Sequence, residues 1–198
     1  MGAITLLDTL RQRPAVLLMG LGLISGGLSA AWGETFTLGG LQLLGMVFLL
    51  DPAALPIGLF YGAALGLGMT LALRKAWAAI LVPVTTIYAW SAAVHTAIRL
   101  QRNSGADADL VAASLCAGAV GAGLTHLGCS LLASGLRRPW RICLTCTVGA
   151  AAGMLFFMGE RKMVDERLLY VIWQPAVAFS IGLWLPRGHT GGHAPGAA

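Results

Sequence analysis

Charged residues are scarce in this chain, and that scarcity limits the class of protein it can be. Only 11% of the 198 residues are charged, whereas 57% are hydrophobic, and the mean hydropathy is +0.78. Soluble domains carry about 25% charged residues. So few charges suit a chain whose sides face lipid. We therefore expect an all-α membrane protein, with residues 1–187 forming one transmembrane helical domain and residues 188–198 a disordered C-terminal tail.

The sequence also lacks the short motifs of common enzymes and nucleic-acid-binding proteins. It has no H-E-x-x-H, G-x-S-x-G or G-x-x-x-x-G-K-[ST] pattern, and no basic face interleaved with aromatic residues. We expect no enzyme, no cofactor and no nucleic-acid partner. The predicted spans below contain no Asp, Glu, Lys or Arg, which argues against a pump driven by a buried carboxylate relay.

Long apolar runs are what the sequence does have. A bilayer core about 30 Å thick needs about 20 apolar residues in a helix. Five segments meet this need readily, and a sixth, Ile142–Gly159, is slightly short. The five are Pro14–Trp32, Leu55–Leu73, Ala76–Ile98, Leu110–Ser134 and Leu168–Pro186. Phe36–Leu50 would reach only about 22 Å, so it is either a short seventh span or a re-entrant or interfacial helix. We expect a bundle of six transmembrane helices, with seven as the alternative.

The cations favour six spans with a cytoplasmic N-terminus. That threading places eight Lys and Arg residues inside and five outside, against seven and six for a seven-span threading. It puts two similar Arg-Trp corners, at residues 73–77 and 136–140, on the cytoplasmic side. Only two of the 13 cations are Lys, and Ala and Gly abound, as in proteins from GC-rich bacteria. We therefore expect a multi-pass protein of a bacterial inner membrane.

Small residues recur at intervals of four in four of these spans. Such residues let membrane helices approach closely, because lipid gives no hydrophobic drive for helix association. The pattern predicts a compact bundle, either a homo-oligomer or packed on a partner membrane subunit. The residues are Gly22 and Gly26, Gly58, Gly62 and Gly66, Ser114 and Gly118, and Gly149 and Gly153.

One predicted hairpin holds four soft metal ligands, His126, Cys129, Cys143 and Cys146. The H-x2-C and C-x2-C spacings resemble a zinc site. Depth argues against zinc, because His126 would lie about 16 Å and Cys143 about 3 Å from the turn. Only Cys129 and Cys146 lie at depths that allow them to meet, as a thiol pair or metal site, and packing is the simpler interpretation. Haem held by His95 and His126 fails the same test, since their depths differ by about 20 Å.

Polar residues and prolines in two spans suggest a solute path. Pro83 and Pro175 each remove an internal hydrogen bond and kink a helix, and kinked helices with polar side chains often form solute sites in transporters. The expected lining residues are His126, Thr85, Thr86, Gln174 and His95. Structural hydrogen bonding across helices is the alternative role for the same residues.

These observations predict a small polytopic carrier or channel, or a component of one, for a small solute. The alternative is a non-transporting membrane subunit or scaffold that packs against a larger complex. A thiol- or metal-handling protein using Cys129 and Cys146 is a third hypothesis.

Overall fold

The computed structural model describes residues 9–32, 54–101 and 106–186, and 86% of these residues are helical with no strand among them. The all-helical prediction is therefore confirmed for this part of the chain. The long helices are α2 (Pro14–Trp32), α4 (Ala54–Leu73), α5 (Ala78–Gln101), α6 (Asp107–Ser130) and α7 (Pro139–Glu160), followed by the shorter α8 (Leu168–Gly182). A 3-10 turn, η1 (Ser134–Arg137), joins α6 to α7. The segment Phe36–Leu50 and the tail 188–198 lie outside the described residues.

Five of these helices are long and apolar enough to cross a bilayer, which indicates a multi-pass membrane protein. The lengths of the last two differ from the prediction. Helix α7 has 22 residues because it begins at Pro139, whose fixed φ suits the first position of a helix. Helix α8 has only 15 residues. After Gly182 the α-helix gives way to a turn, in which the Leu185 N–H donates to the Gly182 carbonyl. The helix ends here because Pro186 disfavours α-helical backbone in the residue before it.

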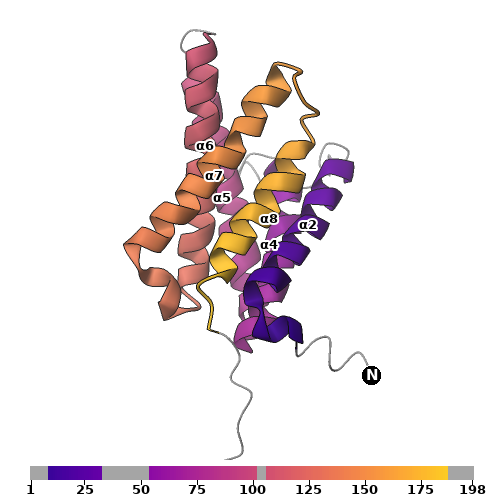
Figure 1. The fold of residues 1–198 in the computed structure, drawn as a ribbon, viewed down its shortest axis with the longest axis vertical. Coiled ribbons are helices and arrows are strands. Elements are labelled where there is room, and N and C mark those ends of the chain that lie inside the picture. Colours follow the sequence, from indigo (N-terminus) through magenta and orange to yellow (C-terminus); the bar gives the residue numbers. More distant parts are fainter. Residues whose placement is uncertain (1–8, 33–53, 102–105, 187–198) are drawn as a thin grey trace, which may run out of the picture.

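The six helices form a closed ring in which each packs against the next along the chain and α8 returns to α2 (Figure 1). Helix α2 runs antiparallel to α4, since Gly68 lies against Leu18 and Leu21. Trp32 and Ala54 therefore lie at the same end of the ring. Lys75 donates to the Leu132 carbonyl at 2.7 Å, so the two Arg-Trp corners lie together at the opposite end.

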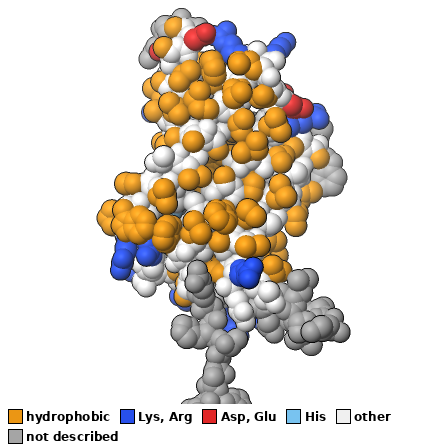
Figure 2. Space-filling model, viewed as in Figure 1, with side chains coloured by type: hydrophobic (Ala, Val, Ile, Leu, Met, Phe, Trp, Pro, Cys, Tyr) orange, Lys and Arg blue, Asp and Glu red, His pale blue; other side chains and the backbone are white. Residues whose placement is uncertain are grey.

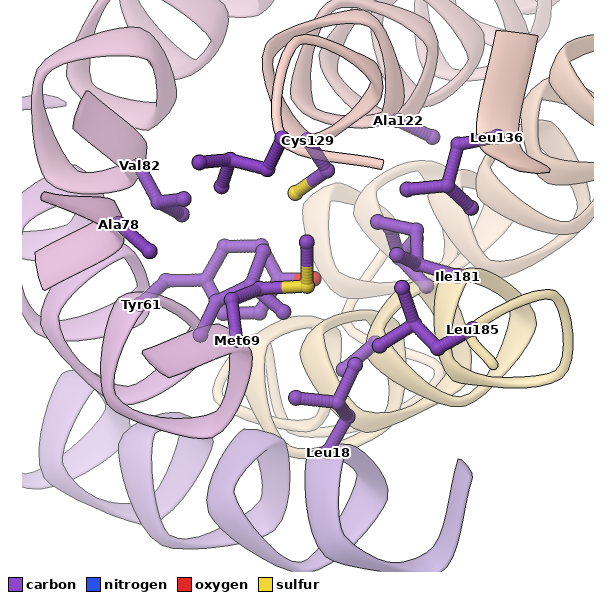
Figure 3. Close-up of a cluster of buried hydrophobic side chains, with 14 of the residues drawn as sticks. Leu18, Tyr61, Met69, Ala78, Val82, Ala122, Cys129, Leu136, Ile181 and Leu185 are labelled. Atoms are coloured by element: carbon purple, nitrogen blue, oxygen red, sulfur yellow. The ribbon is translucent and has the colours of Figure 1, made fainter. Parts of the chain in front are cut away.

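Apolar side chains from all around the ring fill its centre (Figure 3). Tyr61, Met69, Cys129 and Ile181 point inward there, and each is almost completely buried. In the part of the chain that the structure describes, the middle of the ring is a packed core and not an open pore.

The small residues predicted to mediate helix contacts do so within this chain. A Cβ on Gly62 would lie 2.5 Å from the Cα of Pro83 on α5, and one on Gly26 would lie 2.6 Å from the Tyr170 carbonyl oxygen on α8. On Gly153 it would lie 2.5 Å from the Ser114 carbonyl oxygen on α6. These separations leave no room for a methyl group, so the three helix pairs owe their close approach to glycine.

The outer surface of the ring is apolar, as lipid contact requires. Ile24 is 62% exposed and Ile80 is 73% exposed, whereas Ser, Thr and Gly residues occupy much of the interior. Figure 2 shows hydrophobic side chains over the middle of one face, with the acidic side chains in view gathered at one end. Arg141, at the other end, lies against both Trp140 and Trp184, with its guanidinium carbon 5.3 Å and 4.8 Å from the two ring centroids. Arg-Trp contacts of this kind are typical of membrane–water interfaces.

Candidate functional site

His126 is held between α6, α7 and η1 and is completely buried. Its Nε2 lies 3.0 Å from the Leu136 carbonyl oxygen, and its Nδ1 lies 2.8 Å from the Thr145 hydroxyl oxygen. Because a carbonyl only accepts, Nε2 carries the proton and donates. In the neutral ring Nδ1 then accepts the single hydroxyl hydrogen of Thr145, for which the Arg141 carbonyl oxygen at 3.1 Å is the more distant acceptor. Both ring nitrogens are satisfied, so His126 links three elements and has no nitrogen left for a solute.

Gln174 joins α8 to α2 in the same way. Ser25 donates to its Oε1 at 2.6 Å, and its Nε2 donates to the Ser29 hydroxyl at 3.0 Å. All three side chains are at most 1% exposed. The amide therefore bridges two turns of α2, a contact that the sequence alone does not identify, because Ser25 and Ser29 lie 149 and 145 positions away.

The three remaining predicted lining residues lie on α5 and do not meet the other two. Thr85 and Thr86 both donate to the Val82 carbonyl oxygen, at 3.0 and 2.7 Å. His95 is exposed on the outside of the ring, with Nδ1 2.7 Å from the carbonyl oxygen of Ser91 on its own helix. The structure thus places the five residues at separate helix contacts. Only Thr85 and Thr86, which are adjacent on α5, lie together.

The cysteines do not gather either. Cys129 is buried in the central core, whereas the Cys146 sulfur lies against Gly123, six residues earlier on α6 and so about 9 Å along it. Cys116 and Cys143 are exposed, and all four thiols are free. Among the described residues no group of three His, Cys, Asp or Glu side chains is placed to hold a metal ion.

A cavity of about 190 Å³ opens elsewhere, between the later half of α5, the first half of α6, the end of α7 and the start of α8. Three aromatic rings form one wall. Trp90 lies 5.2 Å from Trp173 and 6.0 Å from Tyr170, centroid to centroid. A fourth aromatic residue, Phe156, also lines the cavity. Small residues and aliphatic side chains form the rest of the lining, which comprises Ile57, Ala93, Val94, Ala97, Ser114, Ala117, Gly118, Gly121, Gly153 and Leu169.

The chemistry of this cavity is almost entirely apolar. None of its lining residues is charged. The Ser114 hydroxyl donates to the Leu110 carbonyl at 2.7 Å, and the Trp173 indole N–H donates to the Gly149 carbonyl at 3.1 Å. A dry cavity of about 150 Å³ holds a benzene molecule, so this cavity has room for one ring or a branched chain end.

The sequence points to the two kinked spans, which carry Trp90 and Trp173, but does not identify this cavity. The available signal was the spacing of the small residues that face them. Ala93 and Ala97, and Ala117 and Gly121, are pairs four residues apart on neighbouring helices. Such pairs normally allow close packing, and here they line the cavity together with the large rings.

No protein-family model matches the chain, and no curated protein or solved structure matches it.

Proposed function

We propose that this chain is the membrane-embedded binding component of a carrier for a small, lipid-soluble solute, which it takes into the cavity beside Trp90, Tyr170 and Trp173. The observation that carries the proposal is the cavity itself, which has an aromatic wall and no charged lining residue. Ligand sites in proteins are concave and mostly apolar, with a few polar groups that fix orientation. A solute with one ring or branched end fits the volume, and any longer tail extends into the surrounding lipid.

The hydrogen bonds of the polar residues support an apolar solute over a polar one. A polar solute that leaves water must exchange its hydration for side-chain partners. The side chains of His126 and Gln174 already form hydrogen bonds within the protein, with Leu136, Thr145, Ser25 and Ser29. The centre of the ring is also packed with apolar side chains, which disfavours a channel along the axis.

The alternative of a scaffold that packs on a larger complex through its glycine faces has less support. The glycines at the predicted helix contacts face helices of the same chain. Gly20 and Gly27 on α2 have nothing within 4 Å of a Cβ position and would be free to meet another protein. Two glycines with free space around them on one helix support a docking function less strongly than the cavity supports solute binding.

We further propose six crossings of a bacterial inner membrane with the Arg-Trp corners in the cytoplasm. In the described residues, the end that holds these corners has cations and no acid, namely Arg11, Arg13, Arg74, Lys75, Arg137, Arg138 and Arg141. The opposite end mixes both signs, including the Arg161–Asp107 ion pair. The positive-inside rule favours this orientation, and the shared end of Trp32 and Ala54 agrees with an even number of crossings. Single cysteines at Arg74 and Arg138, in a chain without its own cysteines, should both resist an impermeant thiol reagent in whole cells, whereas a cysteine at Lys162 should react.

Binding in the cavity is testable with a simple ring compound and two matched variants. Ala117→Phe, in the cavity wall, adds a ring to a space that holds about one ring. Ala112→Phe adds the same ring to an exposed position of the same helix. With the protein in lipid nanodiscs, fluorine NMR of 4-fluorotoluene should show saturable binding to the native chain and to Ala112→Phe, and only lipid partitioning with Ala117→Phe. Equal signals from all three proteins would refute the proposal.

A further inference from the structure

Of the buried polar side chains that find no hydrogen-bond partner within the described residues, Trp90 is the one that lines the cavity. Its side chain is 9% exposed, and its indole nitrogen has no partner there. The neighbouring Trp173 differs, because its N–H donates to the Gly149 carbonyl at 3.1 Å. Two indoles in contact thus have unequal hydrogen bonding, one complete and one not.

A buried N–H without an acceptor is costly. In an apolar environment such a group costs about 1–3 kcal/mol relative to a bonded one, and lipid around the helices offers no water to compensate. An indole N–H can only donate. A partner for it must therefore bring an acceptor, such as a carbonyl or ether oxygen, and gains nothing from bringing a donor.

The remaining walls define the body of that partner. Trp90, Trp173 and Tyr170 provide ring faces and edges at the spacings of aromatic pairs. On the α6 side, Gly118 and Gly121 contribute no side chain, and Ser114 and Ala117 contribute only small ones. A flat, unsaturated ring fits between such walls better than a bulky saturated one.

We infer that the solute is a planar ring compound carrying a hydrogen-bond acceptor, such as an aromatic ketone, and that it accepts a hydrogen bond from Trp90 Nε1. This inference rests on the proposed function and deepens it by naming the chemical class of the solute. The nitrogen is covered by its neighbours, so the inference requires the indole to turn its N–H toward the cavity when the carbonyl enters.

Two fluorinated probes of almost identical shape separate the acceptor from the ring. They are 4-fluoroacetophenone, which has a carbonyl oxygen, and 4-fluoro-α-methylstyrene, which has a =CH2 group in its place. After subtraction of lipid partitioning measured with Ala117→Phe, the native chain should bind the ketone about tenfold more tightly, as one additional hydrogen bond predicts. Trp90→Phe keeps an aromatic ring but removes the donor, and it should bind both probes with equal affinity. The infrared carbonyl stretch of the bound ketone should move to lower frequency in the native chain and not in Trp90→Phe.

The outcomes distinguish this inference from the function on which it rests. Equal affinities of the native chain for the two probes would refute the requirement for a hydrogen-bond acceptor and leave the proposed apolar binding site intact. Retention of the ketone preference in Trp90→Phe would assign the hydrogen bond to another donor and overturn the role of Trp90. Binding of neither probe above the Ala117→Phe level would overturn both proposals. The native chain's own preference decides the question even if Trp90→Phe fails to fold.

Discussion

Replacing Gln174 with Leu separates the two roles proposed for this residue, helix bridge and solute-path lining. The substitution removes the hydrogen bonds to Ser25 and Ser29, at 2.6 and 3.0 Å. Interhelical hydrogen bonds in membrane proteins contribute about 0.6 kcal/mol on average and at most about 1.7 kcal/mol. Ser25 keeps its second acceptor, the Gly22 carbonyl at 3.0 Å, so no strong further penalty is expected. The free energy of unfolding should therefore fall by about 1–3 kcal/mol.

The assay is reversible unfolding in mixed micelles, measured either by steric trapping or by detergent titration. A double-mutant cycle between Gln174→Leu and Ser25→Ala should give a coupling energy of about 0.6–1.7 kcal/mol. Gln101→Leu, at an exposed position at the end of α5, is the matched control and should change stability by less than about 0.5 kcal/mol. Zero coupling, with native stability and weakened solute binding in Gln174→Leu, would refute the assignment of Gln174 as a bridge between α2 and α8.

Three further predictions follow from the same contacts. His126→Leu leaves the buried Leu136 carbonyl without its donor and should lower the free energy of unfolding by about 1–3 kcal/mol without changing solute affinity; native stability would contradict this. Gly153→Ala places a methyl group 2.5 Å from the Ser114 carbonyl oxygen and should cost about 1–3 kcal/mol as overpacking, whereas Gly27→Ala, with open space around it, should be neutral or stabilising by up to about 1 kcal/mol; equal effects of the two in the unfolding assay would show that the α6–α7 contact is wrong. His95→Ala removes an exposed side chain bonded only to its own helix and should change stability by less than about 0.5 kcal/mol, with a larger loss in the same assay pointing to a contact that the ring does not provide.

The positions of the helices followed closely from the sequence, because apolar length and helix-start residues are local signals. The limits of α2, Pro14 and Trp32, were predicted without error. The sequence places the beginning of α7 three residues late, at Ile142, because the charge of Arg141 ends the apolar run there. In the structure the helix continues through Arg141, whose side chain reaches back to the Gly135 carbonyl and lies against two Trp rings.

The partners of the polar residues did not follow from the sequence, because they depend on which helices are neighbours in the ring. The sequence indicated that Gln174 and His126 need hydrogen bonds in a membrane, but not that Ser25, Ser29 and Leu136 provide them. Periodicity identifies the face of a helix and not the helix that it meets. The cavity was missed for the same reason, since its wall combines residues from five helices.

The position of a bound solute is the most direct test of the claim that the aromatic cavity, and not the polar residues, is the binding site. Crystals of the protein grown with 4-bromoacetophenone would locate the bromine by its anomalous scattering. The peak should lie between Trp90, Trp173 and the α6 glycines, with the carbonyl oxygen within hydrogen-bond distance of Trp90 Nε1. A peak beside Thr86, His126 or Gln174, or no bromine within the ring of helices, would contradict the claim.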